Sequence, residues 1–283
     1  MVVGDVSFLN PTDEENRMKV GIAGFGVIGK AVGRALDLGI EGATLEAVVS
    51  GNAQKARDAM RDYGKPVDVV SPAELAACCD VIIECAPTAA FLDIVEPALA
   101  AGRQVVTVSA AALIENMHVV DAARHAGGRI ILATGALLGL DAVRAAAEGE
   151  IYSVTMVTRK PPKSLIGAPH LERNGIDVTD LTEPLLVFRG SAREGAAGFP
   201  ANVNVAASLA LAGIGPDRTQ LEIWADPTKQ RNTHTIKVDA DSVRFEMTIE
   251  NVPTPEKPGT GKVTALSVIA ALKSLTSTLR VGT

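Results

Sequence analysis

The feature that most constrains the fold is a glycine motif set between a strand and a helix. An apolar run over residues 19–23 leads into Gly24-x-Gly26-x-x-Gly29, and a helical pattern continues over residues 30–38. In such a motif the first glycine allows a tight turn, the second lets the backbone approach a pyrophosphate, and the third lets the helix pack close to the strand. The helix N-terminus offers free N–H groups to the phosphates. The segment therefore predicts a dinucleotide-binding turn made by Gly24, Phe25, Gly26, Val27, Ile28 and Gly29.

The end of the second expected strand bears on which dinucleotide is bound. Enzymes that bind NAD alone usually place Asp or Glu there, where it holds the ribose 2′-hydroxyl. Here the strand ends at Ser50 with no acid, and Lys55 and Arg57 follow in the next helical pattern. These two cations either meet a 2′-phosphate or lie on a solvated helix face. We therefore expect NAD or NADP as the cofactor, with Ser50 beside the nucleotide and NADP⁺ accepted at least as well as NAD⁺.

Net charge, apolar runs and cysteine spacing argue against several classes of function. The net charge of −6 argues against a nucleic-acid partner. No apolar run reaches the roughly 18 residues of a membrane span, and we expect neither a membrane segment nor a signal segment. Cys78, Cys79 and Cys85 have no metal-ligand spacing. We expect no metal site, reduced thiols and a cytoplasmic location.

Strands and helices alternate through the first half of the chain. Strands are predicted over residues 19–23, 44–49, 67–70, 81–84, 104–108 and 129–133, and helices over residues 53–63, 87–101 and 114–126. This alternation favours an α/β fold with a Rossmann-type, doubly wound parallel sheet and a site at the carboxyl ends of its strands. We predict a disordered extension over residues 1–17 and a dinucleotide-binding domain over residues 18–136.

After Gly135 the pattern changes to strands without intervening helices. Helices are predicted over residues 139–147 and 203–212, an irregular stretch over 160–183, and strands over 152–158, 185–188, 219–225, 233–238 and 243–250. A hairpin turn is expected at residues 239–242. This pattern indicates a substrate-binding and catalytic α+β domain over residues 137–258, with a mostly antiparallel sheet. The last helix, over residues 262–276 within a C-terminal segment 259–283, is expected to pack back on the first domain.

Among the four histidines, His234 differs from His118, His125 and His170. It shares strand parity with Ile236 and Val238, so its side chain is expected on the packed face of the sheet. A histidine there is either a satisfied core residue or a general acid/base, for which an ordinary pKa near 6.5 suits neutral pH.

Cations gather in the segment Arg159-Lys160-Pro161-Pro162-Lys163 and again at residues 229–231, upstream of His234. The two prolines stiffen the backbone, which aims Lys163 reproducibly. The cations are either ordinary exposed loop residues or ligands of an anionic substrate. We take Lys163 as the first candidate for binding a substrate carboxylate.

Several segments of the chain resemble the L-aspartate dehydrogenase family. They are the glycine motif, Thr134-Gly135-Ala136, Lys160-Pro161-Pro162-Lys163-Ser164-Leu165, Phe199-Pro200-Ala201-Asn202-Val203-Asn204-Val205-Ala206, Ala225-Asp226-Pro227 with His234 downstream, and Glu250-Asn251-Val252-Pro253. They follow one another in order from Met18 to the C-terminus, so the resemblance covers nearly the whole chain. The Lys-Pro-Pro-Lys and Asn-Val-Asn-Val segments are more specific than the glycine motif.

The resemblance implies an NAD(P)-dependent oxidative deamination of L-aspartate to iminoaspartate, or the reverse reductive amination. Iminoaspartate then gives oxaloacetate and ammonia or feeds NAD biosynthesis. The resemblance also implies that His234 is the catalytic base and that Ala136 and Asn204 contact the cofactor. Asp226 is a candidate to orient the imidazole, and we expect a homodimer.

Two other classes of protein remain open at this point. One is another two-domain Rossmann reductase of amino-acid metabolism, related to homoserine dehydrogenase or dihydrodipicolinate reductase. The other is a non-enzymatic, dinucleotide-sensing module, which would be expected to carry a DNA-binding helix pair or a basic surface.

Overall fold

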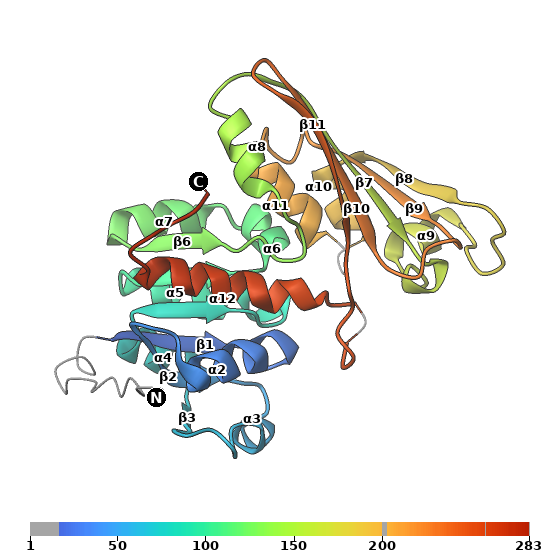
Figure 1. The fold of residues 1–283 in the computed structure, drawn as a ribbon. Helices are drawn as coiled ribbons and strands as arrows, with labels where there is room; N and C mark the ends of the chain where they lie inside the picture. The colour runs from blue at the N-terminus through green and yellow to red at the C-terminus, as the bar shows by residue number, and fades with distance from the viewer. Residues whose placement is uncertain (1–16, 200–202, 258, 283) are drawn as a thin grey trace, which may run out of the picture.

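The structure, a computed structural model, describes residues 17–199, 203–257 and 259–282. The predicted N-terminal extension lies outside the described residues apart from Arg17. The described chain builds two β-sheets, which lie one above the other in Figure 1. None of the described helices is long and apolar enough to cross a membrane.

The first sheet, sheet A, is parallel and six-stranded, with the strand order β3-β2-β1-β4-β5-β6. Its strands are β1 (Met18–Ala23), β2 (Ala43–Val49), β3 (Asp68–Val69), β4 (Val81–Glu84), β5 (Gln104–Thr107) and β6 (Arg129–Leu132). Apolar residues on both faces are buried, as in β4, where Ile82 and Ile83 pack in different cores. Continuous apolar runs of this kind are typical of parallel strands that are covered on both sides. The predicted doubly wound sheet is confirmed.

Helices cover both faces of sheet A. One core contains residues of α2 (Val27–Gly39), α3 (Ala53–Ala59) and α12 (Lys262–Thr276). The other contains residues of α4 (Pro72–Cys78), α5 (Phe91–Ala100), α6 (Ala110–Glu115) and α7 (His118–Ala126), and the short helix η1 (Thr88–Ala90) precedes α5. Helix α12 runs across sheet A in Figure 1, below β6 in this view, and contacts α2 and β5. Its buried residues Val268 and Leu272 join the core of sheet A, although they come from the end of the chain.

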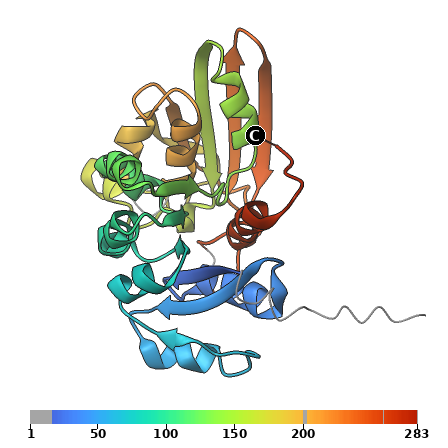
Figure 2. The same ribbon diagram turned by 90° about the vertical axis from the view of Figure 1, so that its left-hand side faces the viewer.

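The second sheet, sheet B, has the order β11-β10-β7-β9-β8. Its strands are β7 (Ile151–Lys160), β8 (Leu185–Ser191), β9 (Gln220–Ala225), β10 (Thr233–Ala240) and β11 (Arg244–Glu250). Three of its neighbouring pairs are antiparallel, and β7 with β9 is parallel, so the predicted mostly antiparallel sheet is confirmed. One face packs on α8 (Leu140–Ala146), α9 (Pro169–Asn174), α10 (Ala192–Gly198) and α11 (Asn204–Ala212). Figure 2 shows these helices gathered on one side of the strands.

The structure differs from the predicted elements mainly in short helices. The helix predicted over residues 114–126 is two helices, α6 and α7, separated at Asn116–Met117. The stretch predicted as irregular over residues 160–183 contains η2 (Pro162–Ser164) and α9, and neither α4 nor α10 was predicted. These helices have three to seven residues, which is too short for an apolar period of 3.6 to stand out.

Three strand ends of sheet B meet at one edge. Strand β10 pairs antiparallel with both β7 and β11, so the end of β7, the start of β10 and the end of β11 coincide. The chain next to this edge is tied together by backbone bonds, from Asn251 N–H to Asn232 O and from Lys262 N–H to Val252 O. Since α12 begins at Lys262 and packs on sheet A, this end of sheet B is held close to sheet A and its helices.

Candidate active site

The glycine turn after β1 has the space that a bound pyrophosphate needs. Gly24 has a φ of 98°, in the left-handed region, and a Cβ there would lie 2.6 Å from the backbone of Cys85. A Cβ on Gly29 would overlap the carbonyl oxygen of Gly24, so this glycine lets α2 pack against the turn. Gly26 is exposed, precedes the first turn of α2, and has nothing within 4 Å of an added Cβ. Two of the glycines are therefore required by the fold, whereas Gly26 faces open space at a helix N-terminus, as a phosphate site requires.

The other residues of the turn are divided between core and cavity. The Phe25 side chain is buried in the core on the α2 side of sheet A, so only its backbone remains on the turn. Val27 and Ile28 line a cavity of about 500 Å³. The opposite wall of this cavity comes from the segment that leads into α12, including Thr254, Thr260 and Gly261.

The end of β2 carries no acidic side chain. The Ser50 hydroxyl donates to the carbonyl oxygen of Asn52, 3.1 Å away. The Asn52 side chain caps α3 by accepting from the backbone N–H of Lys55. Lys55 and Arg57 are both exposed on α3. The local hydrogen bonds thus fix the loop, and the two cations remain available at its surface.

Two asparagine side chains connect the second half of the chain to the first. Asn204, the first residue of α11, accepts from the backbone N–H of Ala111 at 3.1 Å, at the start of α6. Asn251 donates from its amide nitrogen to the carbonyl oxygen of Ala136 at 3.1 Å. The residues expected to contact the cofactor, Ala136 and Asn204, therefore both lie where the two halves meet. Asn251 is buried, and its Oδ1 has no hydrogen-bond partner among the described residues.

His234 lies in the first part of β10 with only 3% of its surface exposed. The expectation that it points to the packed face is confirmed. Thr158 is its partner across the β7–β10 ladder, and the Thr158 hydroxyl lies 3.0 Å from Nδ1 of the imidazole. Burial, and to a smaller extent the charge of Lys160, lowers the pKa of His234 to about 3. The imidazole is therefore neutral at physiological pH, with a lone pair on one of its ring nitrogens.

Asp226 does not hold the imidazole, contrary to the expectation from the sequence. Its carboxylate accepts from Arg159 at 3.1 Å and from the backbone N–H and hydroxyl of Thr228. Arg159 also lies over the Trp224 ring, with 4.7 Å between the guanidinium carbon and the ring centroid. Since side chains alternate along β7, Arg159 lies on the opposite face of the sheet from Thr158. Asp226 therefore pairs with a residue on the face that does not carry His234. Thr158 is the residue that fixes the ring, and only the strand register identifies it.

Lys163 lies at the mouth of a cavity beside the three strand ends. The cavity has a volume of about 560 Å³ and is lined by Pro161, Lys163, Ser164, Gln230, Arg231, Asn232, Asn251, Pro253, Gly259 and Gly261. Lys163 is exposed in η2, and Arg231 provides a second cation. Gly261 also lines the cavity beside the glycine turn, so the two cavities adjoin. Lys163 and Pro161 thus lie on one cavity with the segment that precedes β10, the strand that carries His234. His234 itself is not among the residues that line this cavity.

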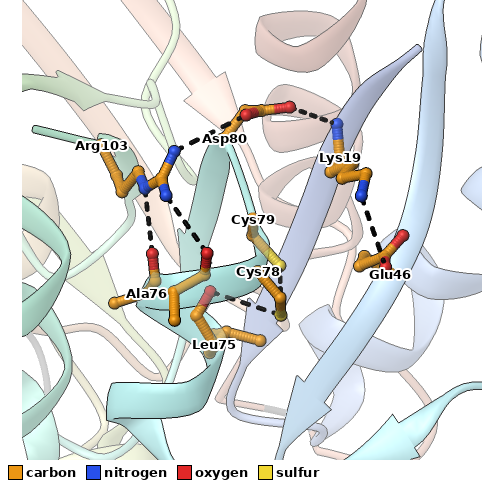
Figure 3. Close-up of polar contacts among 9 residues, drawn as sticks. Lys19, Glu46, Leu75, Ala76, Cys78, Cys79, Asp80 and Arg103 are labelled. Atoms are coloured by element: carbon orange, nitrogen blue, oxygen red, sulfur yellow. Dashed lines mark hydrogen bonds and ion pairs between the residues drawn. The ribbon is translucent and has the colours of Figure 1, made fainter. Parts of the chain in front are cut away.

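A separate polar cluster lies at the opposite, amino-terminal edge of sheet A (Figure 3). Asp80 accepts from the backbone N–H of Lys19 and pairs with Arg103, which also donates to the carbonyl oxygen of Ala76. Ligands of doubly wound sheets bind at the carboxyl ends of the strands. This cluster therefore connects β1, β4 and β5 structurally and takes no part in the candidate site.

The remaining titratable candidates also lie outside the site. His118 and His125 are on α7, His118 faces Glu96 on α5, and His170 packs against aromatic rings. Within residues 17–199, 203–257 and 259–282 no group of His, Cys, Asp and Glu could hold a metal ion. The three cysteines are unpaired thiols.

Comparisons with known proteins agree with this geometry. Residues 24–133 match the family model of the homoserine dehydrogenase NAD binding domain, and residues 141–275 match that of the aspartate dehydrogenase C-terminal domain. The chain is 52% identical to an L-aspartate dehydrogenase of Bradyrhizobium diazoefficiens, with 95% of each chain covered. It is 50% identical to an L-aspartate dehydrogenase of Bordetella bronchiseptica, covering 93% of this chain and 97% of that one.

A solved structure shares the fold over most of the chain. An aspartate dehydrogenase from Thermotoga maritima superposes with a TM-score of 0.73 at 24% identity, covering 94% of this chain and 100% of that one. A homoserine dehydrogenase from Thiobacillus denitrificans also shares the fold, with a TM-score of 0.60 at 15% identity, covering 92% of this chain and 73% of that one. The family model matched by residues 141–275, however, is that of the aspartate dehydrogenase C-terminal domain. The chain therefore belongs to the L-aspartate dehydrogenase family, and it is an oxidoreductase with an NAD-binding domain.

Proposed function

We propose that this chain oxidises L-aspartate to iminoaspartate with NAD⁺ or NADP⁺, or runs the reverse reductive amination, and that His234 moves the proton. The observation that carries the proposal is a buried, neutral imidazole fixed by Thr158 at the strand ends that adjoin the glycine turn. Iminoaspartate released to water gives oxaloacetate and ammonia, and a role in NAD biosynthesis follows if another enzyme consumes it first.

We propose the following residues as the cofactor site: Gly24, Phe25, Gly26, Val27, Ile28, Gly29, Ser50, Ala136 and Asn204. The open space at Gly26 and the helix N-terminus of α2 suit a pyrophosphate. Lys55 and Arg57 are exposed and suit a 2′-phosphate, which supports use of NADP⁺. When bound, the nicotinamide ring supplies the chemistry of hydride acceptance from Cα of the substrate.

The contact with Thr158 supports a role of His234 as the general base. In the tautomer in which Nδ1–H donates to the Thr158 hydroxyl, Nε2 carries the free lone pair. The substrate ammonium must lose a proton before hydride can leave Cα, and Nε2 accepts it. In the reverse direction the protonated ring returns this proton to the amine. In the forward direction the ring releases the proton to solvent, and the neutral ring then activates the water that attacks the imine.

The substrate carboxylates require cationic partners, and we propose Lys163 for one of them. Lys163 and Arg231 lie on the wall of the 560 Å³ cavity, next to the end of β7 and the start of β10. A dicarboxylate entering there meets positive charge in a protein whose net charge is −6.

Substitution of His234 tests the proposal. We expect His234→Asn to lower kcat for L-aspartate by roughly 10²–10⁴-fold, the usual yield of general acid–base catalysis, with the cofactor Kd nearly unchanged. The matched control is His118→Asn, because His118 is exposed on α7 far from the site. A folded His234→Asn protein with normal turnover would remove His234 from the mechanism.

We also propose how the chain is divided into domains and that two copies of it form a dimer. Residues 18–136 bind the dinucleotide, residues 137–258 hold the substrate, and residues 259–283 pack back on the first domain.

The face of sheet B away from its helices carries the half-buried Val157 and Trp224, which supports a homodimer. Unpaired thiols support a reducing, cytoplasmic location. Sedimentation equilibrium of the wild-type protein measures the assembly.

A further inference from the structure

Lys160 is a buried lysine next to the candidate base. It is the last residue of β7, and only 3% of its surface is exposed. Lysine is rarely buried to this extent, because its ammonium group must leave water. Burial lowers the pKa of Lys160 to about 8, so the surroundings as a whole disfavour its charge, although the ammonium remains mostly protonated at neutral pH.

The strand register directs Lys160 toward His234. Thr158 and Lys160 are two residues apart on β7, so their side chains lie on the same face of sheet B. Thr158 is the residue that contacts His234, and the charge of Lys160 lowers the pKa of the imidazole. The next residue, Pro161, lines the 560 Å³ cavity. Lys160 is therefore a diagonal neighbour of the base on one face of sheet B, and the residue that follows it lines the cavity.

The neighbouring cation Arg159 has a different environment. Its guanidinium lies on the other face of β7, where it pairs with Asp226 and stacks on Trp224. Lys163 is exposed at the cavity wall. Among these three cations of the segment, Lys160 alone is buried on the face that carries His234.

We propose that Lys160 binds one carboxylate of the substrate beside His234. The inference rests on the proposed function and adds a residue to it. Lys160 holds the inner carboxylate, and Lys163 holds the outer one at the cavity wall. A dicarboxylate held by Lys160 at the end of β7 and by Lys163 in η2 has a fixed position relative to the imidazole.

The bound carboxylate also changes the electrostatics of the base. The charge of Lys160 disfavours the imidazolium form of His234 in the free protein. A carboxylate paired with Lys160 neutralises that charge, so the imidazole becomes a stronger base when the substrate is present. Binding of the substrate thus raises the pKa of the imidazole that accepts its proton.

The test compares Lys160→Met with Lys237→Met as the matched control. Lys237 is exposed on β10 and pairs with Glu246, away from the site. We expect Lys160→Met to raise the KM for L-aspartate and the Kd for succinate, measured by calorimetry, by roughly 10- to 100-fold, the effect of losing one charged hydrogen bond. Lys160→Arg retains the charge and should recover part of the affinity.

Two further readouts separate binding from a structural role. The Kd for the dinucleotide should stay within about twofold, and the Tm should not fall, because burial disfavours the charge of Lys160 in the folded state. Unchanged succinate binding in Lys160→Met would overturn the inference. Loss of folding in both Lys160→Met and Lys160→Gln would also overturn it, since the residue would then be structural.

The succinate measurement keeps this inference separate from the proposed function. If the wild-type protein binds succinate and Lys160→Met does not, Lys160 binds carboxylates even where L-aspartate is not turned over. If L-aspartate is turned over but only Lys163→Met weakens succinate, the proposed function stands and the role of Lys160 is wrong.

Discussion

The neutral imidazole of His234 makes the stability of the folded protein depend on pH. Its pKa is about 3 in the folded protein and about 6.5 in an unfolded chain. Above pH 6.5 both states are uncharged at this ring, so its full contribution is present. As pH falls below 6.5 the unfolded state takes up a proton that the folded state does not, until the folded pKa is reached.

We therefore predict that stability is lost between pH 6.5 and about pH 3 by up to about 1.4 kcal/mol per pH unit from this group. Urea unfolding of the wild type and His234→Gln at pH 7.5 and pH 5 measures it. The wild type should lose about 2 kcal/mol more than the variant over this range. Equal losses would mean that the ring is protonated in the fold or solvated.

A second residue-level prediction separates the glycines of the turn. Gly26→Ala adds a Cβ into open space, so the fold should keep its Tm, but the methyl group lies where the phosphates approach. We expect its Kd for NADP⁺ and NAD⁺ to rise at least tenfold.

Gly29→Ala should give the opposite pattern, because its Cβ would overlap the Gly24 carbonyl oxygen and lower the Tm. Gly64→Ala is the control, since its Cβ would meet only ordinary contacts. Calorimetry and thermal melts on the same preparations distinguish the three variants. Normal dinucleotide affinity in Gly26→Ala would contradict the assignment of the turn.

At the scale of single elements, strand β7 carries both the support and the electrostatic neighbour of the base. Thr158→Val keeps the shape of the side chain and removes the hydroxyl that holds Nδ1. We predict that kcat falls by roughly 3- to 10-fold, the ~1 kcal/mol of one neutral hydrogen bond, while the dinucleotide Kd is unchanged. Rescue by Thr158→Ser, which restores the hydroxyl, is the control. A Thr158→Val enzyme as active as the wild type would show that packing alone holds the ring.

The strands and helices also show how much of the fold could be predicted from the sequence. The strands of sheet A could be predicted because each is an apolar run between helical patterns, and burial on both faces requires that composition. The helices α4 and α10 could have been found from their capping boxes, Ser71 with Glu74 and Ser191 with Glu194. Their seven residues hide the apolar period, so the caps are the stronger signal.

The candidate site is only partly accessible from the sequence. Strand parity alone predicts that His234 is buried, and that holds. Its partnership with Thr158 and the placement of Lys160 depend on the register between β7 and β10, which lie more than 70 residues apart. The parallel pairing of β7 with β9 is likewise non-local. A sequence pattern carries no register between distant strands, so Asp226 was the wrong choice of partner.

At the scale of the whole molecule, the last helix packs against the first half of the chain. Strand β10 starts and strand β11 ends next to the start of α12, and α12 packs on α2 and the core of sheet A. The hydrogen bonds of Asn204 to Ala111 and of Asn251 to Ala136 cross between the same two halves. Stability of the nucleotide-binding unit therefore depends on the last helix, and binding at the glycine turn should be linked to it.

Leu272→Ala tests this linkage. Leu272 is fully buried on α12, and a Leu→Ala change at such a site costs about 2–5 kcal/mol. We predict a lower Tm for the variant without ligand and a recovery of about 2.7 kcal/mol with dinucleotide at 100 times its Kd. Leu266→Ala, on the exposed side of the same helix, is the control and should leave the Tm nearly unchanged. If dinucleotide stabilises the wild type but not Leu272→Ala, the predicted recovery is wrong, and the packing of α12 is required for binding and not only for stability. If Leu272→Ala melts as the wild type does, α12 does not support sheet A in solution, and the C-terminal segment is not part of the nucleotide-binding fold.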